Sequence, residues 1–298
     1  MKRILVTGGA GSVGREVAAC LASRGHRVRV FDLPGCDFGL LEHLAQAEVV
    51  KGDIRDLDAL RQAIVDVDAV IHLAAVLPPI SERSRQATMA VNVGGTASII
   101  AALAQESPGA HLILSSSVCV YGDTSAMEPP VCVSWPTQAL DCYGESKIEA
   151  ERLVMAGPIP YTILRISGIS VPAFLEPPSV WPFTADQRLE FICRTDVVVA
   201  LAACAEAGEG SGKPYRSGAP LNIAGGSTWR MLGREYVAHL NEVMGLPPEE
   251  ARYSERPGYY DWYDTDESQA VLGYQQTPFE RFLVLLQAAI EDALKGQG

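Results

Sequence analysis

The chain has 298 residues, 48% of them hydrophobic, and a formal net charge of −12. This length and apolar content suit one large α/β domain, or a core with a smaller lobe. The acidic balance, with no basic run, argues against nucleic acid or an anionic membrane as a partner, because phosphate binding needs local positive charge.

The seven cysteines include no Cys-x-x-Cys pair, and the five histidines are scattered without metal-ligand spacing, so we expect no metal site. The N-terminus passes straight into an apolar strand pattern without a leader-like segment, and no apolar run reaches about 18 residues. We therefore expect a soluble protein of the reducing cytoplasm.

Apolar runs alternate with helix-like segments over the first 166 residues, which is typical of repeated strand–helix winding. The pattern predicts strands at 3–7, 27–32, 47–51, 68–73, 111–116 and 161–166, and helices at 12–24, 56–65, 84–106 and 139–155. Several strands are apolar throughout, which fits burial on both faces of a parallel sheet. The predicted fold is α/β, a doubly wound parallel sheet of the Rossmann type over residues 1–166.

After Ile166 the sequence becomes rich in proline and aromatic residues, which indicates an irregular segment laid over the core. We predict a small C-terminal substrate lobe over 167–298. Helical patterns recur at 195–206, 231–244 and 278–294, with a strand pattern at 221–223. The elements at about 195–206 and 221–224 are expected to return to the core.

The glycine-rich stretch from Thr7 to Gly14 lies between the first strand and the first helix. A strand, a tight glycine turn and a helix N-terminus present unpaired N–H groups and a positive dipole end, which suit a dinucleotide pyrophosphate. Gly8, Gly11 and Gly14 follow a Gly-x-x-Gly-x-x-Gly spacing. A turn without a ligand remains the alternative.

Asp32 stands at the end of the second strand, 18 residues after Gly14. A carboxylate there would accept hydrogen bonds from both adenosine ribose hydroxyls and repel a 2′-phosphate, so NAD is favoured over NADP as the cofactor. Asp32 could instead form the turn before Leu33-Pro34-Gly35. Asp53, with Ile54 beside it, ends the third strand and could meet the adenine amino group, or cap the next helix.

Tyr143 and Lys147 are four residues apart and therefore lie on one face of the predicted helix. The preceding strand ends in Ser115-Ser116-Ser117, at the sheet edge where doubly wound folds bind ligands. A half-buried tyrosine crossed by a snorkelling lysine is the purely structural alternative.

Seven motifs in order now carry a resemblance. They are Thr7 to Gly14, Asp32, Gly52-Asp53-Ile54, His72 to Ala75, Asn92 to Thr96, Ser115 to Gly122, and Tyr143 to Lys147. The chain resembles the extended short-chain dehydrogenase/reductases, and within them the NAD-dependent epimerase/dehydratase group, which includes UDP-galactose 4-epimerase. The likeness spans residues 1 to about 166 and continues more weakly through Arg194 to Val197 and Asp264 to Phe282.

The resemblance implies that Tyr143 donates or accepts a proton, that Lys147 is its electrostatic partner and a ribose ligand, and that Ser117 bonds the reacting oxygen. It also implies a further set of cofactor-lining residues, namely Ser12, Val13, Leu73, Ala74, Ala75 and Asn92. Ala74 and Ala75 could simply pack, and Asn92 could be a buried amide that bridges loops. A nearby ammonium lowers the pKa of a phenol appreciably only in a closed, partly dry pocket, which we expect here.

The chain departs from nucleotide-sugar relatives after the sixth strand. Gly168 stands where those relatives have a substrate-binding Asn, and a Tyr-Gly-Pro is missing. The lobe is aromatic instead, which would suit sugar stacking or the lobe's own core. Arg165, Arg188, Arg194 and Arg256 could hold an anionic substrate, or pair with acids.

We expect an NAD-dependent oxidoreductase or epimerase that transfers hydride at a hydroxyl-bearing carbon of a sugar or nucleotide sugar. Alternatives are a dehydrogenase or reductase of a small non-nucleotide sugar acid or hydroxy-carbonyl compound, and a regulator that binds NAD without turnover. The resemblance also implies a homodimer joined through helices 84–106 and 139–155, although these helices could pack only on the sheet.

Overall fold

The computed structural model describes residues 1–207, 218–247 and 251–295. Its central sheet has seven parallel strands in the order β10-β6-β5-β4-β1-β2-β3. They are β1 (Arg3–Thr7), β2 (Arg27–Asp32), β3 (Ala47–Lys51), β4 (Ala69–His72), β5 (His111–Ser117), β6 (Tyr161–Ile166) and β10 (Pro220–Ile223). The predicted α/β fold with a doubly wound parallel sheet is confirmed.

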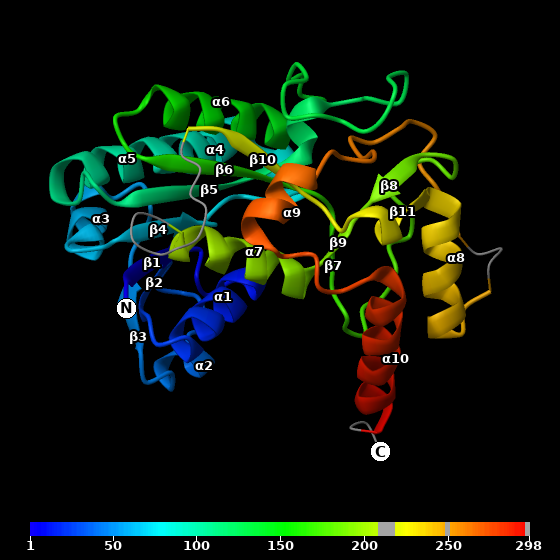
Figure 1. The fold of residues 1–298 in the computed structure, drawn as a ribbon, viewed down its shortest axis with the longest axis horizontal. Helices are drawn as coiled ribbons and strands as arrows, with labels where there is room; N and C mark the ends of the chain where they lie inside the picture. The colour runs from blue at the N-terminus through cyan, green and yellow to red at the C-terminus, as the bar shows by residue number, and fades with distance from the viewer. Residues whose placement is uncertain (208–217, 248–250, 296–298) are drawn as a thin grey trace.

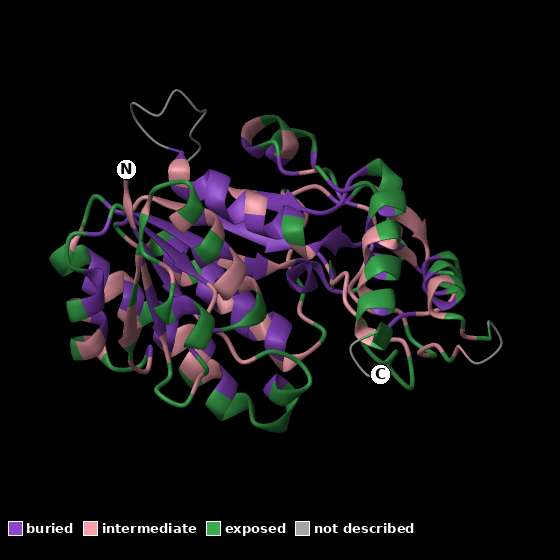
Figure 2. Ribbon diagram, turned by 90° about the horizontal axis from the view of Figure 1, so that it is seen from below, coloured by how far each residue is buried: buried purple, intermediate pink, exposed green. Residues whose placement is uncertain are grey.

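Helices cover both faces of the sheet (Figure 1). One layer holds α1 (Ser12–Ser23), α2 (Gly39–Glu42) and α7 (Arg194–Glu206), and the other holds α3 (Leu57–Ile64), α4 (Arg85–Met89), α5 (Gly95–Glu106) and α6 (Cys142–Ala156). Neighbouring strand residues such as Ile4 and Leu5 are fully buried in two different hydrophobic cores, one in each layer. Figure 2 shows this buried sheet between the helices, which explains why the central strands are mostly apolar.

Residues 85–106 form one helical stretch in which a π-helical turn, Ala90–Gly94, joins α4 to α5. By length and composition alone this stretch could cross a membrane, with a mean hydropathy of 1.5. In the fold, however, α5 packs against α3 and α6. Ile99 and Leu103 are fully buried there, so the apolar sequence of the stretch has a partner within the protein.

The C-terminal lobe has its own core, built on α8 (Gly233–Met244) and α10 (Phe279–Lys295). Two short strand pairs complete it: β7 (Ile169–Ser170) with β9 (Ile192–Cys193), and β8 (Arg188–Glu190) with β11 (Arg230–Leu232). Phe183 and Trp229 are almost completely buried, and Tyr253 and Tyr260 pack against them. Much of the lobe's aromatic content therefore forms its core.

Two elements after residue 167 lie on the central sheet. β10 extends the sheet beyond β6, and α7 packs against α1. A short helix, α9 (Asp266–Leu272), packs in turn against α7. The carboxyl ends of β1, β4, β5 and β6 therefore face the lobe across one crevice, where β1 and β4 mark the point at which the strand order reverses.

Candidate active site

The glycine turn after β1 is shaped by close backbone contacts. Gly8 has φ +69°, and a Cβ there would lie 2.6 Å from the backbone N of Ala74. A Cβ on Gly14 would lie 2.3 Å from the carbonyl O of Gly8, whereas one on Gly11 would meet only that oxygen, at 3.2 Å. Gly8 and Gly14 are thus required by the turn itself, and Gly11 leaves the open side of the turn clear for a ligand.

The helix that follows points its N-terminus into this open side. α1 begins at Ser12 with no side-chain cap, and Ser12, Val13 and Gly14 line a cavity of about 250 Å³. First-turn N–H groups of a helix have no intrahelical acceptor and lie at the positive end of its dipole. The turn can therefore hold a pyrophosphate without a basic side chain.

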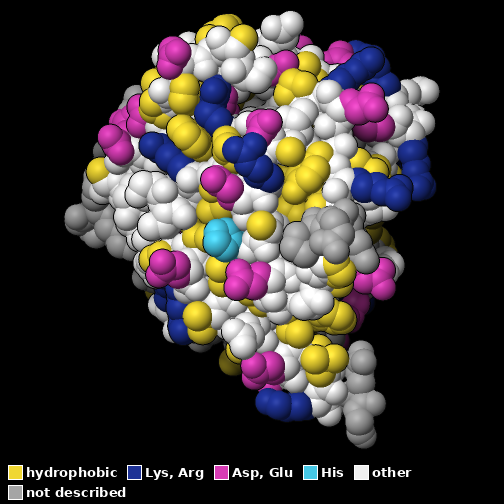
Figure 3. Space-filling model, turned by 90° about the vertical axis from the view of Figure 1, so that its right-hand side faces the viewer, with side chains coloured by type: hydrophobic (Ala, Val, Ile, Leu, Met, Phe, Trp, Pro, Cys, Tyr) yellow, Lys and Arg dark blue, Asp and Glu magenta, His cyan; other side chains and the backbone are white. Residues whose placement is uncertain are grey.

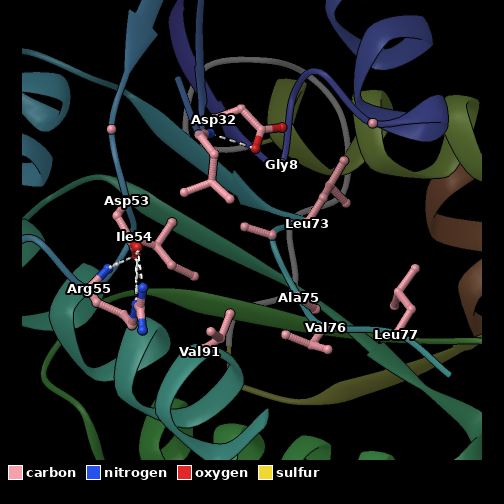
Figure 4. Close-up of a pocket in the computed structure, with 14 residues that line it drawn as sticks. Gly8, Asp32, Asp53, Ile54, Arg55, Leu73, Ala75, Val76, Leu77 and Val91 are labelled. Carbon is pink, nitrogen blue, oxygen red and sulfur yellow. Dashed lines mark hydrogen bonds and ion pairs between the residues drawn. The ribbon is translucent and has the colours of Figure 1, made fainter. Parts of the chain in front are cut away.

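A second cavity, of about 320 Å³, shares Gly8, Gly11, Leu73 and Leu77 with the first. Asp32 lines it, with its carboxylate fixed by N–H groups of Ala10 (3.0 Å) and Leu33 (2.8 Å). Asp32 thus orders the turn, and it also faces the cavity (Figure 4). The Cys36 thiol donates to it as well, at 3.5 Å. A carboxylate offers about four acceptor positions, so about one or two remain for a ligand.

Asp53 and Ile54, after the neighbouring strand β3, also line this cavity (Figure 4). Asp53 does not cap the following helix. The cap of α3 is Asp56, whose side chain accepts from the N–H groups of Asp58 and Ala59. Asp53 pairs instead with Arg55, and the hydrogen bonds from that guanidinium lower the pKa of the Asp53 carboxyl. Arg55 also lines the cavity, and the sequence analysis did not single it out.

The loop after β4 forms the floor, where Leu73, Ala74 and Ala75 line the cavity. Asn92 is not among the residues that line either cavity. Its amide is buried, accepting from the N–H of Val76 (2.7 Å) and donating to the carbonyl O of Val76 (3.1 Å) and the hydroxyl of Ser146 (2.9 Å). Asn92 thus acts as the buried amide that bridges this loop to α6. It holds a loop that lines the larger cavity.

Ser117 and Tyr143 lie on the wall of the smaller cavity, together with the first turn of α1. Ser117 ends β5, and its hydroxyl accepts from the N–H of Cys119 (3.2 Å) at the start of a 3-10 turn. Tyr143 is 8% exposed. The two hydroxyl-bearing side chains therefore line one cavity, which Asp32 does not line.

Lys147 lies one helical turn beyond Tyr143 and is 5% exposed, so it does not snorkel to solvent. Its Nζ donates to the carbonyl O of Ser115 at 2.8 Å and lies 5.5 Å from the centroid of the Tyr143 ring. Burial lowers the pKa of Lys147 to about 8. Burial likewise raises the pKa of Tyr143 well above its usual value, and nearby Cys119, Tyr260 and Asp141 add to that rise.

The expectation that Lys147 makes the Tyr143 phenol acidic is therefore wrong for the protein without a bound cofactor. The reason is that burial, the largest cause of the shift, disfavours the charged phenolate. In this state the phenol is neutral, which suits a proton donor.

The N-terminus of α6 is held by two carboxylates. Asp141 caps it by accepting from the N–H of Gly144 at 2.7 Å. Glu82, on a 3-10 turn (Ile80–Arg83), accepts from the N–H groups of Cys142 (3.0 Å) and Tyr143 (3.1 Å). Glu82 therefore fixes the backbone at Tyr143. The sequence analysis missed it, because its partners are about 60 residues away and no local pattern links them.

Three of the four candidate anion-binding arginines are used inside the protein. Arg165 pairs with Glu151, Arg188 with Asp261 and Arg194 with Glu16. Arg256 has no ion pair among the described residues, and it is exposed. The face of the lobe in Figure 3 likewise shows basic and acidic side chains interspersed. Three of the four arginines that the sequence offers as anion ligands therefore already form ion pairs within the protein.

The position opened by Gly168 is filled by an aromatic ring. A Cβ at residue 168 would lie 2.6 Å from Cδ1 and Cε1 of Phe191. Next to it, Ile166, Ser167 and Ile169 line the smaller cavity, as does Val197 from α7. These four residues were not predicted as site residues, although the end of β6 lies beside Ser117 in the sheet and could have pointed to the first two.

Residues 4–179 match the model of the NAD dependent epimerase/dehydratase family. The chain belongs to this family. Its description makes NAD the cofactor, which confirms the prediction from Asp32 and the glycine turn, and members of the family are enzymes. The glycine cradle, the carboxylates at one end and the hydroxyls at the other fit NAD in the two joined cavities.

Curated relatives match over about half of this chain. A 3 beta-hydroxysteroid dehydrogenase/isomerase of Mycobacterium tuberculosis is 35% identical over 159 residues, which are 52% of this chain and 42% of that protein. A UDP-glucose 4-epimerase of Streptomyces lividans is 31% identical over 178 residues, 58% of this chain and 51% of that one. The match thus spans about half the length of these family members.

Solved structures resemble the whole chain. A short-chain dehydrogenase/reductase superfamily protein from Agrobacterium tumefaciens with bound NAD has a TM-score of 0.81 at 23% identity, and the match covers 99% of each chain. MoeE5 in complex with UDP-glucose and NAD has a TM-score of 0.80 at 25% identity, covering 98% of this chain and 99% of that one. The family's fold therefore extends through the lobe.

Proposed function

We propose that the protein transfers hydride between NAD and a hydroxyl-bearing carbon of a sugar or nucleotide sugar, with Tyr143, Lys147 and Ser117 as the catalytic groups. The observation that carries the proposal is that Ser117 and Tyr143 line the same cavity as the first turn of α1. When bound, NAD would accept or donate the hydride. Its pyrophosphate would lie at the Ser12–Gly14 turn and its adenosine ribose at Asp32.

Side chains of the protein would transfer the proton that accompanies the hydride. The neutral phenol of Tyr143 would donate its proton to a carbonyl oxygen in the reductive direction and take it back from a hydroxyl in the oxidative one. The hydroxyl of Ser117 would hold that oxygen. Lys147, fixed by the carbonyl of Ser115, would place a positive charge beside the phenol and so favour the phenolate when it forms.

A second candidate is a dehydrogenase or reductase of a small, non-nucleotide hydroxy compound. It is favoured by the ion pairs of Arg165, Arg188 and Arg194, which leave few free cations for a diphosphate. It is favoured too by Phe191, which fills the space beside Gly168. The M. tuberculosis relative is named for a steroid, a substrate without a nucleotide.

Purified protein is mixed with NAD and with panels of sugars, sugar acids and UDP-sugars, and the absorbance of reduced nicotinamide is followed. Products are also analysed by NMR, because an epimerase would leave no net reduced cofactor. We expect turnover that falls at least about a hundredfold in Tyr143→Phe, the usual scale of acid–base catalysis. Tyr161→Phe is the matched control, since Tyr161 begins β6 at the other end of the strand.

Full activity in Tyr143→Phe would remove the mechanism. Turnover of UDP-sugars alone would support the nucleotide-sugar reading, and turnover of free sugar acids alone would support the second candidate. NAD binding without turnover on any panel would instead favour a cofactor-sensing regulator.

We also propose a homodimer. α5 and α6 lie side by side on the outer face of one helix layer (Figure 1), where residues such as Ala97 and Met155 are exposed. Two copies would bury these faces against each other. Light scattering tests the proposal, and a monomer at micromolar concentration would contradict it.

A cytoplasmic location is proposed as well. All seven cysteines are free, and Cys119, Cys193 and Cys204 are buried as thiols, which accords with a reducing compartment. Fractionation of the native cell, followed by detection with an antibody, tests this location.

A further inference from the structure

A buried polar cluster lies directly behind the proposed catalytic residues. Tyr143, Lys147 and Glu151 follow one another at four-residue intervals along α6 and are all buried. Lys147 donates to the carbonyl O of Ser115 at 2.8 Å, and Glu151 accepts from the hydroxyl of Ser116 at 2.5 Å. Two successive turns of the helix are thereby attached to two successive residues of β5, just before Ser117.

Arg165 completes the cluster from the neighbouring strand. It lies opposite Ser116 in the register of β5 and β6, and its guanidinium bonds both carboxylate oxygens of Glu151, at 3.0 and 2.7 Å. Its remaining donors reach the hydroxyl of Tyr121 (3.0 Å) and the carbonyl of Val133 (3.1 Å). Tyr121 in turn donates to Asn222 of β10 at 2.6 Å. Both carboxylate oxygens of Glu151 and all three guanidinium nitrogens of Arg165 therefore have hydrogen-bond partners.

Stability alone gives a weak reason for such a pair. The side chains of Arg165 and Glu151 are only 5% and 2% exposed, and the cost of dehydrating two ions often cancels their attraction. The pair does, however, place a fixed negative charge one helical turn from Lys147. That lysine needs such support, because burial opposes its positive charge.

The groups that face Lys147 come from several elements. Tyr143 and Glu151 lie on its own helix, Cys119 lies on the 3-10 turn after β5, and His72 lies at the end of β4. His72 is buried and neutral near pH 7, since burial lowers its pKa to about 3. The Cys119 thiol is also neutral there, because burial raises its pKa to about 12. Glu151 is thus the one described anionic partner of Lys147 in this set.

We infer that Glu151, held by Arg165 and Ser116, is a positioning residue for the reaction: it fixes α6 on β5 and supplies the negative charge behind Lys147. The inference rests on the proposed function for its catalytic consequence, but not for its effect on Lys147 itself. Tyr143 and Ser117 touch the substrate oxygen, and Glu151 acts on them only through Lys147 and the helix.

The test follows the Lys147 ammonium directly, by NMR of protein labelled with ¹⁵N-lysine. The chain has five lysines, and Lys147→Met identifies the signal. Glu151→Gln removes the charge and keeps the shape. Glu151→Gln/Arg165→Met also removes the guanidinium, so that no unpaired ion remains buried and the fold is preserved. Glu149→Gln is the matched control, on the same helix but only partly buried and paired with Arg152.

We expect the Lys147 titration midpoint to fall by about one pH unit in Glu151→Gln, the scale of one nearby opposite charge, and to stay in place in Glu149→Gln. In the double variant the fall should be smaller, because the opposing guanidinium charge is removed with the carboxylate. The alkaline limb of the activity profile should move with the midpoint. An unchanged midpoint in folded Glu151→Gln, or an equal fall in Glu149→Gln, would overturn the inference. If Tyr143→Phe keeps full activity, the proposed function fails, while the NMR result still decides the role of Glu151.

Discussion

Replacing Asp32 by Asn tests whether this carboxylate holds the cofactor ribose. Its acceptor positions are partly occupied by the N–H groups of Ala10 and Leu33 and by the Cys36 thiol, and about one or two remain for ribose hydroxyls. Each charge-assisted hydrogen bond contributes about 1.5–3 kcal/mol, and a neutral amide retains part of this. We expect NAD binding to weaken by about 3 kcal/mol, or roughly a hundredfold in Kd.

The same change should relax discrimination against NADP, because the negative charge that repels a 2′-phosphate is gone. Isothermal titration calorimetry with NAD and NADP measures both effects, and circular dichroism checks that the turn still folds. Asp37→Asn is the control, since Asp37 is exposed, pairs only loosely with Arg15 and lines neither cavity. An unchanged NAD affinity in Asp32→Asn, with NADP still rejected, would refute the reasoning.

Three further predictions concern burial and close contact. Gly14→Ala should weaken NAD binding at least about tenfold in the same titration, because its Cβ would lie 2.3 Å from the carbonyl of Gly8; normal affinity would show that the turn can widen. Lys147→Met should abolish turnover yet raise the melting temperature by several degrees, since it removes an ammonium whose pKa burial lowers from 10.5 to about 8. Between these pH values the Lys147 side chain of the wild type is protonated in the unfolded chain but not in the folded protein. The free energy of unfolding of the wild type should therefore rise by about 3 kcal/mol from pH 8 to 10.5, relative to that of Lys147→Met. The same pH dependence of stability in both proteins would contradict this. Gly168→Asn should destabilise the protein by about 1–3 kcal/mol in urea unfolding through overlap with the Phe191 ring, and Gly168→Asn/Phe191→Ala should recover part of that loss; no recovery would argue against the contact.

The core of the fold was predictable from local sequence because its central strands, such as β1 and β4, are buried on both faces. Runs such as Ala69–His72 are apolar throughout for that reason, and their alternation with amphipathic helices specifies parallel winding. The lobe was less predictable. The strand pairs β7–β9 and β8–β11 are two or three residues long, too short for any periodic pattern. The helix α9 has only seven residues, and its apolar partners lie on the distant helix α7.

The parts of the site that are contiguous in sequence were found, and those made by distant partners were not. The glycine turn and the Tyr143–Lys147 helix are local motifs. The contacts of Glu82 with α6, by contrast, join residues about 60 positions apart. The sequence could not decide whether Arg188 was free, because Asp261, its partner, lies 73 residues away. The pKa of Tyr143 was misjudged because the degree of burial is a property of the folded protein.

Asn92 gives the site an unusual mechanical coupling. Its side-chain oxygen accepts from the N–H of Val76, and its side-chain nitrogen donates to the carbonyl O of Val76 and to the hydroxyl of Ser146 on α6. The loop after β4 that lines the larger cavity and the helix that carries Tyr143 are consequently joined through the Asn92 side chain. A movement of this loop that releases the coenzyme would also shift α6. The lifetime of the bound coenzyme and the alignment of Tyr143 should therefore vary together.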